Sequence, residues 1–109
     1  MTLYLPQAVA TYFAISNGGE VSRLAACFSA DAVVSDEKRT HRGLEAIEAW
    51  QREARQAFTY QVEPLEAVQR EERLIVTARV SGNFPGSPVN LKHSFEVKHG
   101  LILALAIAP

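Results

Sequence analysis

The sequence predicts a single α+β domain, with helices in its first half and a β-sheet in its second. A length of 109 residues suits one domain with one hydrophobic core. Apolar residues recur at helical spacing up to about residue 58, and they alternate with polar residues from about residue 61 onward. Turn-forming residues separate these segments. We therefore expect one domain over residues 1–109.

Composition and charge exclude several classes of function. The chain is 48% hydrophobic and 21% charged, and its formal charge is -1, with no cluster of Lys and Arg. These values are typical of a globular protein and argue against a nucleic-acid partner. Cys27 is the single cysteine and cannot form an internal disulfide. With no signal-peptide pattern and no apolar stretch of about 18 residues, we expect a cytoplasmic protein that does not insert into a membrane.

Three segments have helical spacing of their apolar residues. The first ends at Asn17-Gly18-Gly19, and the third is the longest. Their expected ranges are residues 6–15, 20–28 and 44–58.

A short strand is expected between the second and third helices, followed by a bent polar connection that carries a small strand. Four longer alternating segments come after the third helix. The expected ranges are residues 32–35 for the short strand, 36–43 for the connection, and 61–69, 73–81, 89–97 and 101–108 for the long strands.

The last strand differs from the others because it is apolar on both faces. Leu101, Ile102, Leu103 and Leu105 all fall within it. A strand tolerates this pattern when both faces are covered, one by helices and the other by a second subunit. We expect a homodimer.

His93 is the most informative single residue. Alternation places it on the same strand face as Leu91, Phe95 and other apolar residues. A buried imidazole needs a hydrogen-bond partner. The ring is either a core histidine bonded to a backbone carbonyl, or a pocket residue that binds or protonates a ligand.

Asp36 and Tyr12 each have two interpretations. Asp36 ends a β-type run, so its carboxylate either projects into a cavity as a general base or lies in a solvated turn beside Glu37. The hydroxyl of Tyr12 either faces a cavity or reaches the surface while the ring packs. Aromatic residues line pockets as well as cores, and the candidate ligand-binding residues are Phe28, Trp50, Leu91 and Phe95.

Motifs for metal, phosphate or acyl chemistry are missing. His41 and His99 lie in polar turn segments, and no His, Cys, Asp or Glu residues have metal-site spacing. The chain has no glycine-rich phosphate loop and no nucleophile elbow. We predict no metal and no cofactor.

The order of elements resembles the superfamily of ketosteroid isomerases, SnoaL-like proteins and nuclear transport factor 2-like proteins. This resemblance covers essentially the whole chain. Short segments of the sequence are also similar to the steroid Δ5-3-ketoisomerase pattern. The matching pieces are Tyr12, Asn17-Gly18-Gly19-Glu20, the FSADA of residues 28–32 and the GLEAIEAW of residues 43–50.

This resemblance implies a cone-shaped fold in which three helices pack on a curved, mixed, mostly antiparallel sheet that encloses a pocket. It places Asp36 at the position of the proton-shuttling carboxylate and Tyr12 at that of the oxyanion-hole tyrosine. His93 stands near the family's second donor, a protonated aspartic acid, and Glu37 replaces the proline that follows the carboxylate. The implied function is an isomerase or polyketide cyclase-like enzyme that acts on a small hydrophobic carbonyl compound by proton transfer. The alternative is a non-catalytic ligand-binding or dimerisation module.

Overall fold

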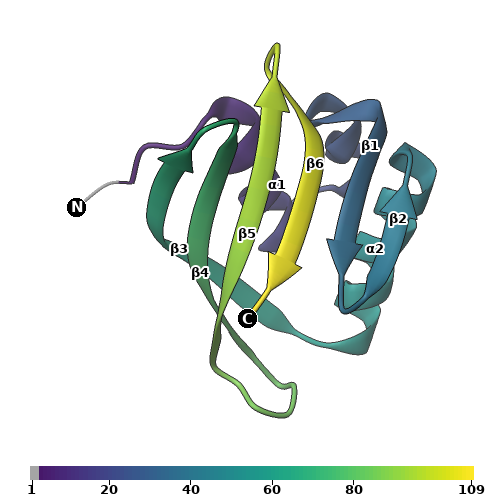
Figure 1. Ribbon diagram of the computed structural model, residues 1–109. Coiled ribbons are helices and arrows are strands. Elements are labelled where there is room, and N and C mark those ends of the chain that lie inside the picture. The colour runs from purple at the N-terminus through teal and green to yellow at the C-terminus, as the bar shows by residue number, and fades with distance from the viewer. Residues whose placement is uncertain (1–2) are drawn as a thin grey trace.

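The computed structural model describes residues 3–109, which form three helices and six strands (Figure 1). None of the helices in this part of the chain has the length and apolar character needed to cross a bilayer. In chain order the elements are α1 (Gln7–Ser16), the 3-10 helix η1 (Val21–Ala26), β1 (Phe28–Asp36), β2 (Arg39–Arg42), α2 (Leu44–Ala57), β3 (Tyr60–Arg70), β4 (Arg73–Gly82), β5 (Val89–Lys98) and β6 (Leu101–Ala108).

The six strands form one mixed sheet in the order β2-β1-β6-β5-β4-β3. β1 and β6 are parallel, and all other neighbours are antiparallel. The ladders shift register in β1, in β3 and between β5 and β6, and such bulges bend a sheet. The helices lie together on one side of the sheet (Figure 1). The predicted α+β class and the mostly antiparallel sheet are confirmed.

The first strand is longer than the sequence predicts. β1 begins at Phe28, the last residue of the expected helix 20–28, so residues 28–31 lie in the strand. The second helix is a 3-10 helix of six residues. Phe28 pairs with Ile102, and the Ile102 N–H donates to the Cys27 carbonyl at 2.7 Å. This pairing spans more than seventy residues of sequence, so local spacing could not reveal it.

The last strand also departs from its predicted pattern. Val97 pairs with Ile102 while Glu96 pairs with Ala104, which leaves Leu103 as an extra residue in β6. Because of this bulge, Ile102 and Leu105 are both buried in the chain's own core. Only Leu101 and Leu103 of the four predicted residues remain half-buried. The strand therefore needs less cover from a second subunit than its sequence suggests.

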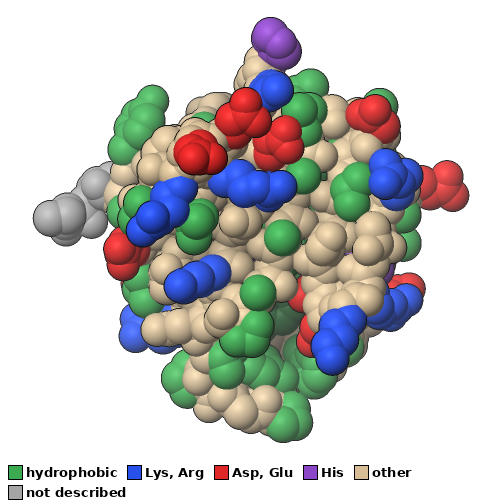
Figure 2. All heavy atoms as spheres, in the orientation of Figure 1, with side chains coloured by type: hydrophobic (Ala, Val, Ile, Leu, Met, Phe, Trp, Pro, Cys, Tyr) green, Lys and Arg blue, Asp and Glu red, His purple; other side chains and the backbone are tan. Residues whose placement is uncertain are grey.

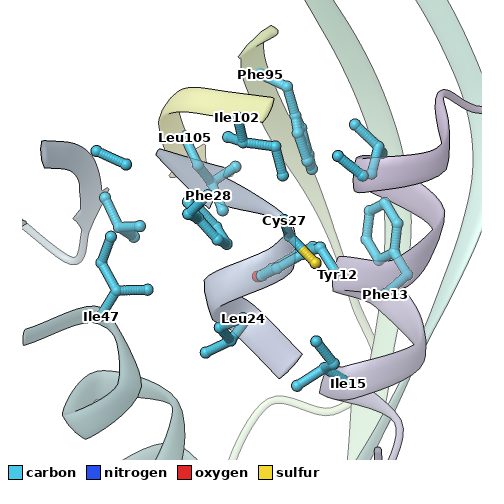
Figure 3. Packing of buried hydrophobic residues seen from close by; sticks show 14 of the residues in the cluster. Tyr12, Phe13, Ile15, Leu24, Cys27, Phe28, Ile47, Phe95, Ile102 and Leu105 are labelled. Carbon is cyan, nitrogen blue, oxygen red and sulfur yellow. The ribbon is translucent and has the colours of Figure 1, made fainter. Parts of the chain in front are cut away.

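Aromatic residues form the centre of the core, between the helices and the sheet (Figure 3). The ring of Tyr12 lies 5.9 Å from that of Phe28 and 5.7 Å from that of Phe95, both edge to face. Edge-to-face pairs add about 0.5–1.5 kcal/mol to the burial of their area. Cys27 is buried beside them as a free thiol. The packing fixes where α1 lies against β5.

Candidate functional site

A cavity of about 540 Å³ lies between the helices and the inner face of the sheet. Most of its wall is apolar, with Trp50 and Phe58 from the α2 side, Leu91 and Ile107 from the sheet, and Phe84 from the β4–β5 loop. Its volume is in the range of small-molecule sites. The polar side chains in its wall are those of Tyr12, Ser16, Asp36, Glu37, Gln51, Tyr60 and His93.

Asp36 reaches this cavity from the end of β1. Its inward direction follows from alternation, because Val34, two residues earlier, is buried in the core. Asp36 pairs with Ile107 of β6 and with Arg39 of β2, across a turn in which Glu37 and Lys38 have positive φ of 50° and 66°. Proline has φ fixed near −65°, so the related family's proline could not stand at Glu37 in this turn.

Trp50 holds the Asp36 carboxylate. Its indole Nε1–H donates to Asp36 Oδ2 at 3.0 Å. The structure gives the Asp36 side chain no other hydrogen bond among residues 3–109. His41 covers the Trp50 ring, with centroids 5.9 Å apart. One carboxylate oxygen is thus tied to α2 and the other is left for a ligand.

His93 lies deep in the wall of the cavity, with 3% of its surface exposed. Its Nδ1 is buried and has no hydrogen-bond partner in the described chain. Burial lowers the pKa of His93 to about 4, and the backbone carbonyl of Leu91 opposes this effect. Phe13 packs edge-on at 5.4 Å and Phe95 stacks at 6.2 Å between centroids. At neutral pH the imidazole is uncharged.

Tyr12 is likewise buried and belongs to a chain of polar groups. Burial raises the pKa of its phenol well above the ordinary value, and a hydrogen bond with the Ser16 side chain partly offsets this. Gln51 Nε2 donates to Ser16 Oγ at 3.5 Å. The charge of Asp36 also raises the pKa of Tyr12. Tyr12 therefore stays a neutral hydroxyl.

Comparison with known proteins identifies the family of this chain. Residues 9–105 match the SnoaL-like domain family. The chain belongs to the SnoaL-like domain family.

Solved structures show the same fold. A candidate polyketide cyclase from Sinorhizobium meliloti is 43% identical, with a TM-score of 0.89 over 94% of each chain. A protein with a ketosteroid isomerase-like fold from Catenulispora acidiphila, in complex with trimethylamine, is 18% identical, with a TM-score of 0.84 over 97% of this chain and 87% of its own. SalBIII, an epoxide hydrolase/cyclase-like enzyme in pyran ring formation in polyether salinomycin, is 18% identical, with a TM-score of 0.79 over 94% and 87%. None of the curated proteins matches the chain in sequence.

The SnoaL-like fold places the predicted site residues in two groups. The first group lines the same cavity of about 540 Å³ and consists of Tyr12, Asp36, His93, Trp50 and Leu91. Phe28 and Phe95 do not line it, because they are fully buried behind Tyr12 and support its ring. Their predicted contact with a ligand has no support in this arrangement.

Sequence reasoning missed Gln51 and Tyr60, which also line the cavity of this SnoaL-like protein. Gln51 lies four residues after buried Ile47, and Tyr60 lies two residues before buried Val62. Helical and strand periodicity could have placed both on inward faces. In residues 3–109, no three His, Cys, Asp or Glu side chains are grouped so that they could hold a metal ion.

Proposed function

We propose that this SnoaL-like protein is an isomerase or cyclase that transfers protons on a small hydrophobic carbonyl compound. The observation that carries this proposal is the Asp36 carboxylate, held by Trp50 in the wall of an apolar cavity that it shares with two uncharged hydrogen-bonding groups, Tyr12 and His93. The 43% identical candidate polyketide cyclase supports the cyclase form of the reaction.

In the proposed reaction, Asp36 Oδ1 removes a proton from the carbon next to the substrate carbonyl, and the electron pair moves onto the carbonyl oxygen. The Tyr12 hydroxyl and a ring N–H of His93 donate hydrogen bonds to this oxygen. Apolar walls strengthen these bonds because they exclude water. Return of the proton to another carbon isomerises the substrate. Attack of the enolate carbon on a second carbonyl of the same molecule, followed by protonation of that oxygen, closes a ring.

The tautomer of His93 decides whether it can take this role. A neutral imidazole has one N–H donor and one acceptor nitrogen. We propose that the N–H faces the substrate oxygen, so that His93 replaces the protonated carboxylic acid of the steroid isomerases. A ¹⁵N NMR spectrum of the protein with a bound naphthol would show which ring nitrogen carries the hydrogen.

Proton exchange on an enolisable ketone tests the function directly. A bicyclic ketone such as 2-tetralone is incubated with the protein in D₂O, and loss of the α-proton signal is followed by ¹H NMR. Asp36→Asn should slow enzyme-dependent exchange by roughly 100-fold or more, the usual contribution of a general base. The control is Asp31→Asn, an exposed carboxylate on the same strand that bonds only Ser29 in the described chain.

Two outcomes would overturn the catalytic proposal. Asp36→Asn could catalyse exchange of the ketone's α-protons as fast as the wild type does, which would show that Asp36 takes no part in the reaction. Alternatively, the wild type could bind the ketone without any exchange above buffer. The second result would make non-catalytic ligand binding the function of this cavity.

We also propose that the protein forms a homodimer through the outer face of its sheet. Its centre carries small or uncharged side chains such as Ala104, Ala106 and Ser94, with charged side chains around them (Figure 2). A sheet face with an uncharged centre and a charged rim can pack against a copy of itself. Light scattering should give twice the monomer mass of 12.0 kDa. A monomer at micromolar concentration would contradict the dimer.

A further inference from the structure

A second hollow of about 330 Å³ adjoins the main cavity. It lies where α1 and α2 end and β3 begins. Ser16, Phe58 and Tyr60 line both spaces, so these three side chains form the boundary between them. Unlike the main cavity, the second hollow contains a cation, Arg55. A ligand that passes Tyr60 would reach this cation from the main cavity.

Arg55 has no acidic partner in the described chain. Arg52 pairs with Glu48 and Arg79 pairs with Glu63, but no carboxylate of residues 3–109 lies within ion-pair distance of Arg55. Its own helix offers none either, since the residues three and four positions earlier are Arg52 and Gln51 and the helix ends two residues after Arg55. A half-buried guanidinium without a counter-charge is an available anion site.

The one protein contact of Arg55 leaves most of its donors unused. Nη2 donates to the Ile15 carbonyl near the end of α1. That carbonyl already accepts a hydrogen bond from the Gly18 N–H at 3.1 Å, so it does not depend on the arginine. A guanidinium has five N–H donors in a fork that matches a carboxylate. The contact orients the group in the hollow and leaves other donors for a ligand.

We propose that the second hollow binds a carboxylate, and that the ligand of this protein is a keto acid whose apolar carbonyl end occupies the main cavity. This inference rests on the proposed function for the carbonyl end. Two charges set the orientation of the ligand. The Asp36 carboxylate repels an anion from the main cavity, whereas Arg55 attracts it at the other side of Tyr60. Asn17, Thr59 and Tyr60 also line this hollow, and the Asn17 amide is held in place by two hydrogen bonds with the backbone of Val62.

A matched pair of probes tests the carboxylate site. 2-Naphthol mimics an enol and carries no carboxylate, while 6-hydroxy-2-naphthoate adds one at the far end of the ring system. Calorimetry should show that the naphthoate binds the wild type more tightly than the naphthol. Arg55→Gln should lower the affinity for the naphthoate roughly tenfold and leave the affinity for the naphthol unchanged. Arg52→Gln, on the same helix but paired with Glu48, should change neither.

A second measurement avoids dependence on the folding of one variant. Raising the salt concentration should weaken binding of the naphthoate to the wild type and leave the naphthol unaffected, because salt screens the ion pair. In Arg55→Lys, the naphthoate should still bind more tightly than the naphthol, but by a smaller factor than in the wild type. Lysine keeps the positive charge and lacks the paired N–H donors of the guanidinium.

The inference is wrong if the two probes bind equally, or if Arg55→Gln and Arg52→Gln have the same effect. Both results leave the proposed function intact, because exchange of neutral 2-tetralone does not involve Arg55. Failure of both probes to bind would instead overturn the inference together with the proposed role of the main cavity.

Discussion

Trp50 Nε1 lies 3.0 Å from Asp36 Oδ2, and this hydrogen bond joins the middle of α2 to the last residue of β1. A hydrogen bond to one oxygen orients a carboxylate, and the second oxygen of Asp36 has no hydrogen bond among residues 3–109. The indole is held in turn by packing against His41. The pair gives Asp36 a fixed position in the cavity, which a base needs for proton transfer.

Trp50→Phe should lower ketone exchange about tenfold, since it removes one hydrogen bond to a charged group. Phe keeps an aromatic ring beside His41, so the fold should be retained. ¹H NMR of 2-tetralone in D₂O measures the rate. In an Asp36→Asn background the same change should have little further effect. Equal loss in both backgrounds would mean that Trp50 acts on the fold and not through Asp36.

His93 makes stability depend on pH. Its pKa of about 4 lies below the unfolded value of 6.5, so the unfolded chain binds more protons between these two values. The contribution of neutral His93 to the free energy of unfolding is therefore complete above pH 6.5 and falls as the pH drops toward 4. The loss is on the order of 3 kcal/mol. Urea unfolding at pH 7.5 and 4.5 measures it.

His93→Gln should remove most of this difference between pH 7.5 and 4.5. His99→Gln is the control, since His99 is exposed in the β5–β6 turn. If His99→Gln and His93→Gln change the pH dependence alike, or if NMR shows His93 titrating near 6.5, the burial argument fails.

Tyr12→Phe separates packing from hydrogen bonding. The ring stays between Phe28 and Phe95, while the hydroxyl that bonds Ser16 is lost. We expect ketone exchange to fall roughly 100-fold, as for loss of one oxyanion donor. Tyr4→Phe is the matched control, because Tyr4 is 90% exposed. An unchanged rate in Tyr12→Phe would leave Tyr12 with a packing role alone.

Phe95→Ala should destabilise the domain by about 3–5 kcal/mol, because it opens a void among fully packed rings. Phe95 is fully buried against Phe13, Tyr12 and His93. Thermal unfolding followed by circular dichroism measures the change. Val68→Ala, at an exposed position of β3, should cost far less. Similar costs for both variants would show that Phe95 is not central to the core.

Local spacing was sufficient to predict most elements. The expected helix at 44–58 is Leu44–Ala57, and the expected strand at 101–108 is Leu101–Ala108. Alternation in the sequence also placed His93 on the inward face of its strand, where it is buried. Periodicity of this kind depends only on residues close in sequence. The single domain over residues 1–109 and the cytoplasmic location stay predictions.

Contacts between distant segments decided the rest. The start of β1 at Phe28 and the bulge at Leu103 depend on how β6 pairs with its neighbours. The hydrogen bond from Trp50 to Asp36, and the lack of an acidic partner for Arg55 among residues 3–109, depend on where α2 lies against the sheet. The sequence alone determines which side chains are present and, through periodicity, on which face of a helix or strand each one lies. Only the packed chain determines which of them meet, because that is set by long-range pairing and side-chain packing.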